Sequence, residues 1–438
     1  MQIMFEKEEK MLNESKKKLE QTEIPDHQIN DAIQQGILKA KDKKRKRKKT
    51  LWTLTVAALL ILTFITSIRV SPAFANAVAS IPGMERFVHL IQFDKGLEAI
   101  IENEYYEPIG VSQIKDNMTF TIDGVIIDET GAEIFYTLEA PHSIKNIDYN
   151  KIDLLNDNRS LIGSIGYNSP RQEHPNRKVD KFSFVFVKPE QFTSNEFEIT
   201  FQIERDNDKI TTFNVPFTLK NDLKNGKVYT LNQEVEMDGQ KMLVKDIMVY
   251  PLRVAVNIEF EEQNDMEILQ FEDMRIEDEN GEVWSSIQNG TSGFGGVENK
   301  ERTYFLQSNY FKEPKELYFK FDKVQSLPKE ESYLLVDFGK KQVLKQPSEG
   351  KIEITNIHSN SLEMKYRPIR ENHSYSLFSQ GKNANGGVVE IPTQSTWNDE
   401  EYQYSEITLD AADIINPVKI DFVAYPNYLD GSVSIQIK

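Results

Sequence analysis

The residue types that most often perform chemistry are few in this sequence, and they are not grouped. The chain contains no cysteine, which excludes disulfides, thiolate zinc sites, iron–sulfur clusters and cysteine nucleophiles. Its six histidines show no HExxH pattern and no paired-ligand spacing, so we interpret each as a surface or turn residue: His27, His89, His142, His174, His358 and His373. The sequence therefore predicts no metal centre, no cofactor and no enzyme activity.

Glycine-rich and acidic segments offer the remaining candidates for a site. The run GTSGFGG at 290–296 lacks the GxSxG frame and follows no strand-to-helix switch, so we expect a mobile loop rather than a phosphate cradle. The acidic clusters at 128–129 and 278–282 do not have the twelve-residue calcium-loop pattern. We interpret them as hairpin turns, with weak surface binding of calcium as the alternative.

An uncharged segment of eighteen residues occupies positions 51–68, and thirteen of its residues are apolar. An α-helix of this length extends about 27 Å, which is enough to cross a hydrocarbon core. We therefore predict one transmembrane helix over residues 51–69. A buried core helix is the alternative, but the many cations beside the segment argue against burial in a protein core.

A basic run precedes this segment, whereas Arg69 is the only cation after it until Arg86. This asymmetry predicts a cytoplasmic N-terminus and an extracellular C-terminal region. Next to a spanning helix, attraction to anionic lipid headgroups explains the run better than a nucleic-acid patch does. The membrane-proximal cations are Lys43, Lys44, Arg45, Lys46, Arg47, Lys48 and Lys49.

A cleavable signal peptide is the main rival to a retained anchor. Residues 73–75 and 77–79 both fit the small-x-small cleavage pattern. The segment before the apolar run is, however, fifty residues long, and signal peptides keep this region short. We therefore expect the helix to remain as an anchor.

Residues 1–50 are predicted to form a helical cytoplasmic tail. One charged helix is expected over Met4–Glu20, and a second helix begins after Pro25, with Asp26 as its N-cap. The second helix carries an apolar stripe that cannot be buried internally, which predicts a partner-binding face. The alternative is that the two helices pack on each other or on the membrane. The stripe consists of Ile29, Ala32, Ile33, Ile37 and Leu38.

The region after the anchor is expected to be mainly β. Short juxtamembrane helices are predicted over residues 70–109, with a break at Pro82-Gly83 and with Asp94 as the cap of the last helix. From 110 onward apolar residues alternate with period two, the pattern of half-buried strands. An internal repeat with an offset of 122 places the apolar positions of 120–138 on those of 242–260. We therefore predict serial immunoglobulin-like β-sandwich modules at 110–225, 226–347 and 348–438.

Charge is divided unevenly between the tail and the rest of the chain. Of 52 basic and 69 acidic residues, 14 and 9 respectively lie within residues 1–50. The larger part is therefore strongly acidic, which repels phosphate backbones and excludes direct nucleic-acid binding by that part.

The order of these segments resembles a family of Gram-positive bacterial membrane proteins with a juxtamembrane domain of unknown function. The resemblance rests on IPDHQINDAIQQGILKAK at 24–41, the Lys/Arg run, the apolar segment, residues 71–112 and the strand pair FTIDGVIIDETGAEIFYTLE at 120–139. Residues 226–340 resemble a second, β-rich domain that often follows. The resemblance implies a negative effector, or anti-sigma factor, of an extracytoplasmic-function sigma factor.

We therefore expect a membrane-anchored regulator whose tail binds a cytoplasmic sigma factor and whose extracellular region is a sensor for an unknown ligand. The sequence lacks the His-x-x-x-Cys-x-x-Cys motif of zinc-binding anti-sigma domains, so any such contact must be metal-free, through the stripe. The alternative is an envelope scaffold or adhesion module with an inert tail.

Overall fold

The computed structural model describes residues 2–21, 72–91, 94–144, 147–167, 174–205, 209–285, 292–295, 299–367, 376–399 and 401–438. The chain divides into two compact units, Met1–Ser71 and Pro72–Lys438. The predicted membrane segment 51–69, the apolar stripe and the basic run all lie outside the described residues. Within the described ranges, no helix has the length and apolar character needed to cross a membrane.

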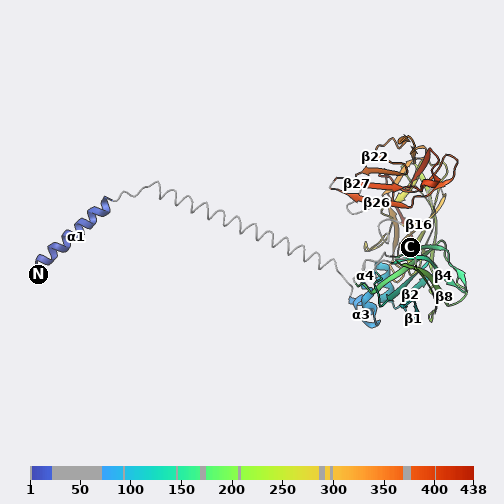
Figure 1. Cartoon of the computed structure of the whole chain (residues 1–438), viewed down its shortest axis with the longest axis horizontal. Coiled ribbons are helices and arrows are strands. Elements are labelled where there is room, and N and C mark those ends of the chain that lie inside the picture. The colour runs from blue at the N-terminus through green and yellow to red at the C-terminus, as the bar shows by residue number, and fades with distance from the viewer. Residues whose placement is uncertain are drawn as a thin grey trace. The chain divides into compact units, whose positions relative to one another are not determined.

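The first unit contains helix α1, Gln2–Glu20, which confirms the helix predicted for the start of the tail (Figure 1). Its apolar residues Met11, Leu12 and Leu19 are exposed. Because this unit offers them no described core, α1 is not held by packing within the described residues.

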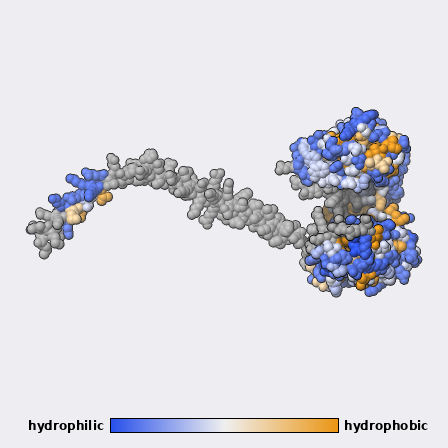
Figure 2. All heavy atoms as spheres, viewed as in Figure 1, coloured by the Kyte–Doolittle hydropathy of each residue, from blue (hydrophilic) through white to orange (hydrophobic). Residues whose placement is uncertain are grey.

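The second unit is mainly β, as the period-two pattern predicts. It begins with a helical segment, which we call the collar: α3 (Pro72–Ser80), η1 (Met84–Phe87), α4 (Val88–Ile91) and α5 (Lys95–Glu102). The strands that follow pair antiparallel throughout and form three β modules. The face visible in Figure 2 is largely hydrophilic, with hydrophobic residues in small groups, as expected for sheets that bury one face each.

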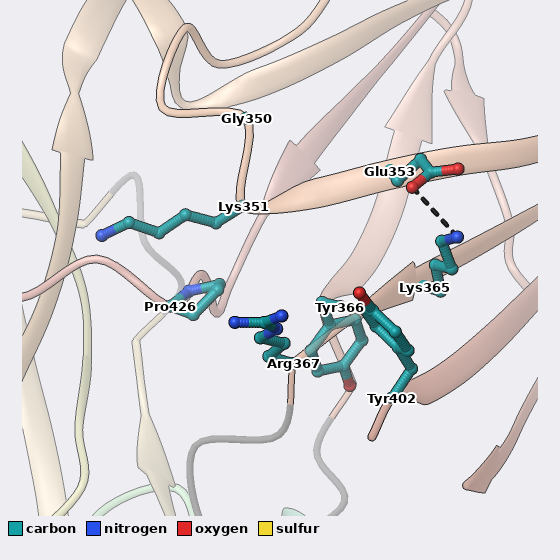
Figure 3. Close-up of a pocket in the computed structure, with 8 residues that line it drawn as sticks. All are labelled: Gly350, Lys351, Glu353, Lys365, Tyr366, Arg367, Tyr402 and Pro426. Carbon is teal, nitrogen blue, oxygen red and sulfur yellow. Dashed lines mark ion pairs between the residues drawn. The ribbon is translucent and has the colours of Figure 1, made fainter. Parts of the chain in front are cut away.

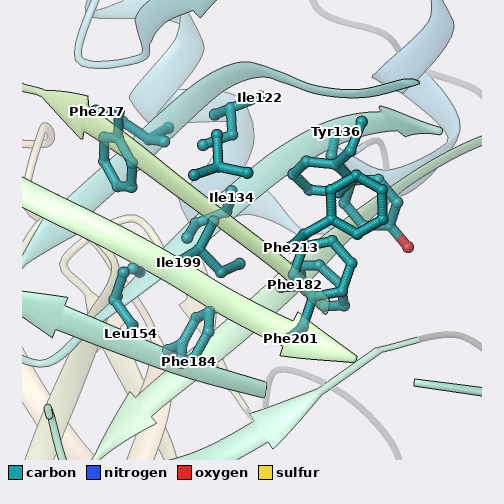
Figure 4. Close-up of a cluster of buried hydrophobic side chains, with 14 of the residues drawn as sticks. Ile122, Ile134, Tyr136, Leu154, Phe182, Phe184, Ile199, Phe201, Phe213 and Phe217 are labelled. Carbon is teal, nitrogen blue, oxygen red and sulfur yellow. The ribbon is translucent and has the colours of Figure 1, made fainter. Parts of the chain in front are cut away.

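The first module packs two sheets face to face over an aromatic-rich core (Figure 4). One sheet has the order β1-β2-β3-β7-β6: β1 (Glu107–Lys115), β2 (Met118–Asp128), β3 (Gly131–Glu139), β7 (Arg177–Phe186) and β6 (Gly163–Gly166). The other has the order β5-β4-β8-β9: β5 (Arg159–Ser160), β4 (Ile147–Asn156), β8 (Glu196–Arg205) and β9 (Lys209–Thr218).

The second module repeats this arrangement. Its first sheet has the order β10-β11-β12-β17-β16: β10 (Lys227–Met237), β11 (Gln240–Val249), β12 (Arg253–Phe260), β17 (Glu301–Gln307) and β16 (Ser292–Phe294). Its second has the order β15-β14-β18-β29: β15 (Val283–Trp284), β14 (Arg275–Asp278), β18 (Leu317–Phe321) and β29 (Val433–Gln436). A separate pair joins β13 (Met266–Phe271) to β19 (Val324–Pro328).

The third module also has two sheets. One has the order β22-β23-β27-β26: β22 (Ile352–Ile357), β23 (Ser361–Tyr366), β27 (Gln403–Thr408) and β26 (Thr393–Asn398). The other has the order β21-β20-β28-β24-β25: β21 (Gln342–Lys345), β20 (Tyr333–Asp337), β28 (Val418–Phe422), β24 (Phe378–Lys382) and β25 (Val388–Val389). Two short 3-10 turns complete it, η2 (Lys329–Glu331) and η3 (Ala411–Asp413).

The predicted repeat is confirmed as a repeated hairpin. Ile122 pairs with Tyr136 in β2–β3, and Val244, 122 positions later, pairs with Ile258 in β11–β12. Both hairpins have a β-bulge immediately after the first residue of that pair. The shorter hairpin β22–β23 has a bulge in the corresponding place, after Ile354. The same pattern of buried residues thus produces the same local bend three times.

The second and third modules exchange their last strands. In the first module, β8 turns directly into β9, its neighbour in the sheet. In the second, β18 instead pairs with β29, from the C-terminal end of the chain, while β20 pairs with β28 of the third module. Three strands, β20, β21 and β29, therefore lie across the boundary expected at 347/348. In Figure 1 the C-terminus accordingly lies away from β22, β26 and β27.

Candidate functional site

The residues predicted to bind a partner or lipid headgroups lie outside the described part of the chain. Among the described residues, charged and buried groups concentrate where the collar meets the first two modules. This junction connects the region directly after residue 71 to the β modules, and it is the candidate site for coupling between them.

The collar is a packed element of the second unit. Phe74, Phe87 and Ile100 are fully buried, and the Phe87 ring packs edge-on against Phe135 of β3, with centroids 5.3 Å apart. Gly83 begins the η1 turn with a left-handed φ of 80°, a conformation that glycine adopts without strain. The predicted break at Pro82-Gly83 therefore redirects the chain onto the module.

Two polar contacts fix the collar. The Arg86 guanidinium lies 2.6 Å from the Asp123 carboxylate of β2, which also accepts a hydrogen bond from the hydroxyl of Thr137. At the start of α5, the Asp94 carboxylate accepts hydrogen bonds from the backbone N–H groups of Gly96 and Leu97. Asp94 is thus the N-cap that the sequence predicts, and it satisfies two otherwise unpaired donors.

The last helix of the collar, α5, and the residues directly after it contact both neighbouring modules. Lys95 Nζ donates to the carbonyl of Val283 in the second module at 3.2 Å. The Tyr105 hydroxyl donates to the carbonyl of Ile127 in the first module at 2.9 Å, and its ring lies 5.9 Å from that of Phe311 in the second. Any relative movement of the two modules must therefore disturb contacts of this segment.

The two modules meet through the equivalent turns of their repeated hairpins. Residues 128–131 connect β2 to β3, and residues 250–253, at the same offset of 122, connect β11 to β12. Asp128 Oδ1 accepts from the N–H and hydroxyl of Thr130 within its own turn. Its Oδ2 accepts from the N–H of Leu252 in the facing turn at 2.7 Å. One fully buried carboxylate therefore holds both turns.

A set of charges, some buried and some half-buried, surrounds this contact, and we call it the junction cluster: Asp94, Asp128, Glu133, Lys181 and Arg253. Arg253 Nη2 donates to the carbonyl of Phe184 at 3.3 Å, and Lys181 Nζ lies 2.7 Å from Glu133. Burial raises the pKa of Asp128 and lowers that of Arg253, and each charge opposes the shift of the other. Burial likewise raises the pKa of Asp94.

Desolvation offsets most of the attraction within a buried charge cluster, whereas removal of one partner leaves an unpaired charge. The junction cluster is therefore suited to hold one arrangement of the collar and the two modules. The described residues contain no group of three His, Asp or Glu side chains arranged to hold a metal ion.

Asp94 and the turn at 128–131 lie where the sequence predicts them, whereas the roles of Asp128 and Arg253 were not predicted. Both belong to turns, which usually lie at the surface, and nothing in the local pattern shows that another turn covers them. The offset of 122 was the available signal, because it maps Asp128-Glu129-Thr130-Gly131 onto Tyr250-Pro251-Leu252-Arg253.

Two family models match the chain. A domain of unknown function (DUF4179) matches residues 44–140, a range that contains the predicted membrane segment, the collar and the hairpin β2–β3. A family of unknown function (DUF5643) matches residues 226–366, which contain most of the second module and the hairpin β22–β23. The chain thus contains two domains of unknown function, and no curated protein matches it significantly.

Three solved structures show limited similarity. A conserved domain protein from Bacillus anthracis is 17% identical with a TM-score of 0.38, over 55% of this chain and 84% of that one. A cycloalternan-forming enzyme and an uncharacterized protein, both from Listeria monocytogenes, are 7% and 8% identical with TM-scores of 0.15. Each of these two matches covers 68% of this chain and 29% of the other. At such TM-scores the matches carry no inference about fold or activity.

Proposed function

We propose that the chain is a single-pass membrane regulator, a negative effector of an extracytoplasmic-function sigma factor, and that it has no enzymatic role. In this proposal residues 1–50 are cytoplasmic and bind the sigma factor through the stripe Ile29, Ala32, Ile33, Ile37 and Leu38. Residues 51–69 cross the membrane, and the immunoglobulin-like modules form an extracellular sensor.

The observation that supports the proposal best is the attachment of the collar to both the first and the second module. The collar begins at residue 72, directly after the predicted membrane segment. A segment that only anchored the modules would need no such packing. A segment that passes a conformational change to the membrane must move together with the modules. The junction cluster supplies one defined arrangement from which a ligand-induced change can depart.

The test is purification of the full chain from its host, followed by identification of co-purifying sigma factors. Ile33→Asp is expected to abolish that association and raise transcription from the sigma factor's promoters, because a charge enters the apolar stripe. Gln34→Asp is the matched control, since it adds the same charge at the adjacent position, outside the stripe. It is expected to retain the association.

The scaffold alternative predicts different results. If no sigma factor co-purifies and transcription is unaltered when the gene is deleted, the regulatory proposal is wrong. If removal of residues 1–49 leaves the cellular phenotype unchanged while removal of 110–438 abolishes it, the chain acts as an envelope scaffold or adhesion module.

A further inference from the structure

A pocket of about 470 Å³ opens at one end of the sheet β22-β23-β27-β26 in the third module. Cations, aromatic rings and one carboxylate surround it (Figure 3). Its lining consists of Gly350, Lys351, Glu353, Lys365, Tyr366, Arg367, Tyr402 and Pro426. A volume of this size matches that of small-molecule sites.

The lining is basic in a chain whose net charge is −17. It includes three cations, Lys351, Lys365 and Arg367, and each lies near a carboxylate. Lys365 Nζ is 3.1 Å from Glu353, and Lys351 Nζ is 3.9 Å from Glu349. Arg367 Nη2 lies 2.9 Å from the carboxylate of Glu401, and both side chains are mostly exposed. Exposed pairs of this kind are weak, so an anionic ligand could replace the carboxylate partner at little cost.

Aromatic rings lie beside these cations. Lys365 Nζ and the Arg367 guanidinium are 5.1 Å and 5.9 Å from the centre of the Tyr402 ring. On the adjoining sheet face, Trp397 of β26 stacks on Tyr404 of β27, with centroids 5.7 Å apart and planes within 5°. Tyr404 lies opposite Lys365 in the sheet. The Trp397 side chain, 46% exposed at the edge strand, extends this aromatic surface away from the pocket.

One lining side chain, Tyr366, carries a buried hydroxyl without a hydrogen-bond partner among the described residues. Its ring is fully packed in the third module's core. Because this hydroxyl has almost no solvent-accessible surface, a ligand in the pocket does not reach it. Tyr366 therefore contributes its ring to the wall of the pocket.

We propose that this pocket binds an acidic saccharide, a pyranose unit bearing a carboxylate or phosphate, within a longer glycan. Lys351 and Arg367 receive the anionic group, and the Tyr402 face packs against the ring's C–H groups. The glycan continues over Tyr404 and Trp397. Planar aromatic groups combined with a few charged hydrogen-bonding groups suit this ligand class. The assignment is independent of sigma-factor binding and applies equally to a scaffold protein.

The test is calorimetric titration of the full chain in detergent micelles with a short oligogalacturonate. A neutral cello-oligosaccharide of equal length, inorganic phosphate and an oligoglutamate peptide are titrated in parallel. Binding of the oligogalacturonate alone supports the proposal. No binding of the oligogalacturonate overturns it, as does equal affinity for the neutral glycan, the phosphate or the peptide.

Variants separate binding from folding. Arg367→Ala is expected to weaken oligogalacturonate binding by about tenfold or more, as loss of a charge-assisted contact requires. Lys340→Ala, which removes an equally exposed cation paired with Asp337, is the matched control and should bind as wild type. Tyr366→Phe is a second control: it should bind as wild type, and the thermal midpoint should be unchanged or raised because an unpaired buried hydroxyl is removed. Wild-type affinity in Arg367→Ala would place the ligand elsewhere.

Discussion

Asp128 and Leu252, 124 positions apart in the chain, are joined by a buried hydrogen bond of 2.7 Å from the Leu252 N–H to the Asp128 carboxylate. Each residue belongs to the turn of its module's repeated hairpin. The two modules therefore contact each other through copies of the same structural feature. The adjacent guanidinium of Arg253 supplies the opposing buried charge.

Replacement of Asp128 by alanine should strongly destabilise the second unit. The change leaves the Leu252 N–H unpaired, which costs about 1–3 kcal/mol, and it removes the charge that most favours the buried Arg253 guanidinium. Chemical denaturation of the full chain measures the free energy of unfolding. Asp148→Ala, the same change at an exposed position of β4, should alter it by less than about 0.5 kcal/mol.

A double variant tests the pairing itself. If Asp128 and Arg253 act as a pair, Asp128→Leu combined with Arg253→Met should destabilise the protein less than the sum of the two single changes. Additive effects would show that the two side chains contribute independently.

Gly131 occupies a position in this junction that tolerates no side chain. A Cβ atom there would lie 2.1 Å from the carbonyl oxygen of Phe184 and 2.9 Å from Arg253 Nη2. Gly131→Ala should therefore force the turn away from the neighbouring strand β7 and from Arg253 of the facing module, and cost about 1–3 kcal/mol. Gly166→Ala is the control, because its nearest neighbour would be 3.8 Å away. Equal stability of the two variants, measured by thermal unfolding, would contradict the close approach at Gly131.

The collar should respond to pH through Glu98. Burial, with Glu102 and Asp94 nearby, raises the pKa of this carboxyl from 4.5 to about 7. The folded state binds this proton more tightly than the unfolded state does. The contribution of protonated Glu98 to folding stability is therefore complete below pH 4.5 and is lost as the pH rises through 7. Glu98→Gln should remove this dependence and stabilise the protein at pH 8 by about 1 kcal/mol after solvent screening. Unfolding curves at pH 5 and pH 8 measure it.

The control for this pH effect is Glu85→Gln, at an exposed position of η1. It should leave the difference in stability between pH 5 and pH 8 as in wild type. An unchanged difference in Glu98→Gln as well would exclude Glu98 as its source.

Local features of the fold were predictable from sequence because they depend on neighbouring residues. Period-two alternation locates strands such as β2 and β3, since each buries one face, and Asp94 is a suitable residue type directly before a helix. The repeat was visible because buried positions in 120–138 and 242–260 must both be apolar.

Long-range relationships were not predictable in the same way. Nothing in the residues around Asp128 shows that a second turn covers it, and nothing in β29 identifies β18 as its neighbour. Strands β20 and β29 have the same alternating pattern of apolar and polar residues as the other strands. This pattern is therefore compatible with either module. The boundary expected at 347/348 was inferred from turn residues in the sequence. In the structure, strand pairing across that position determines the module to which each strand belongs.

The strand exchange leads to the last prediction. Ile435 of β29 is buried in the core of the second module, although it lies at the end of the chain, after the third. Ile435→Ala should cost about 2–5 kcal/mol, and the loss should appear first in the second module. In hydrogen exchange followed by mass spectrometry, amides of β14 and β18 should lose protection before those of β23 and β27.

Val336→Ala in β20 should have the opposite effect, because Val336 lies in the core of the third module. Ser434→Ala, exposed on β29, should leave both patterns as in wild type. If Ile435→Ala instead loosened β23 and β27 first, β29 would belong energetically to the third module, and the exchange of last strands would be wrong.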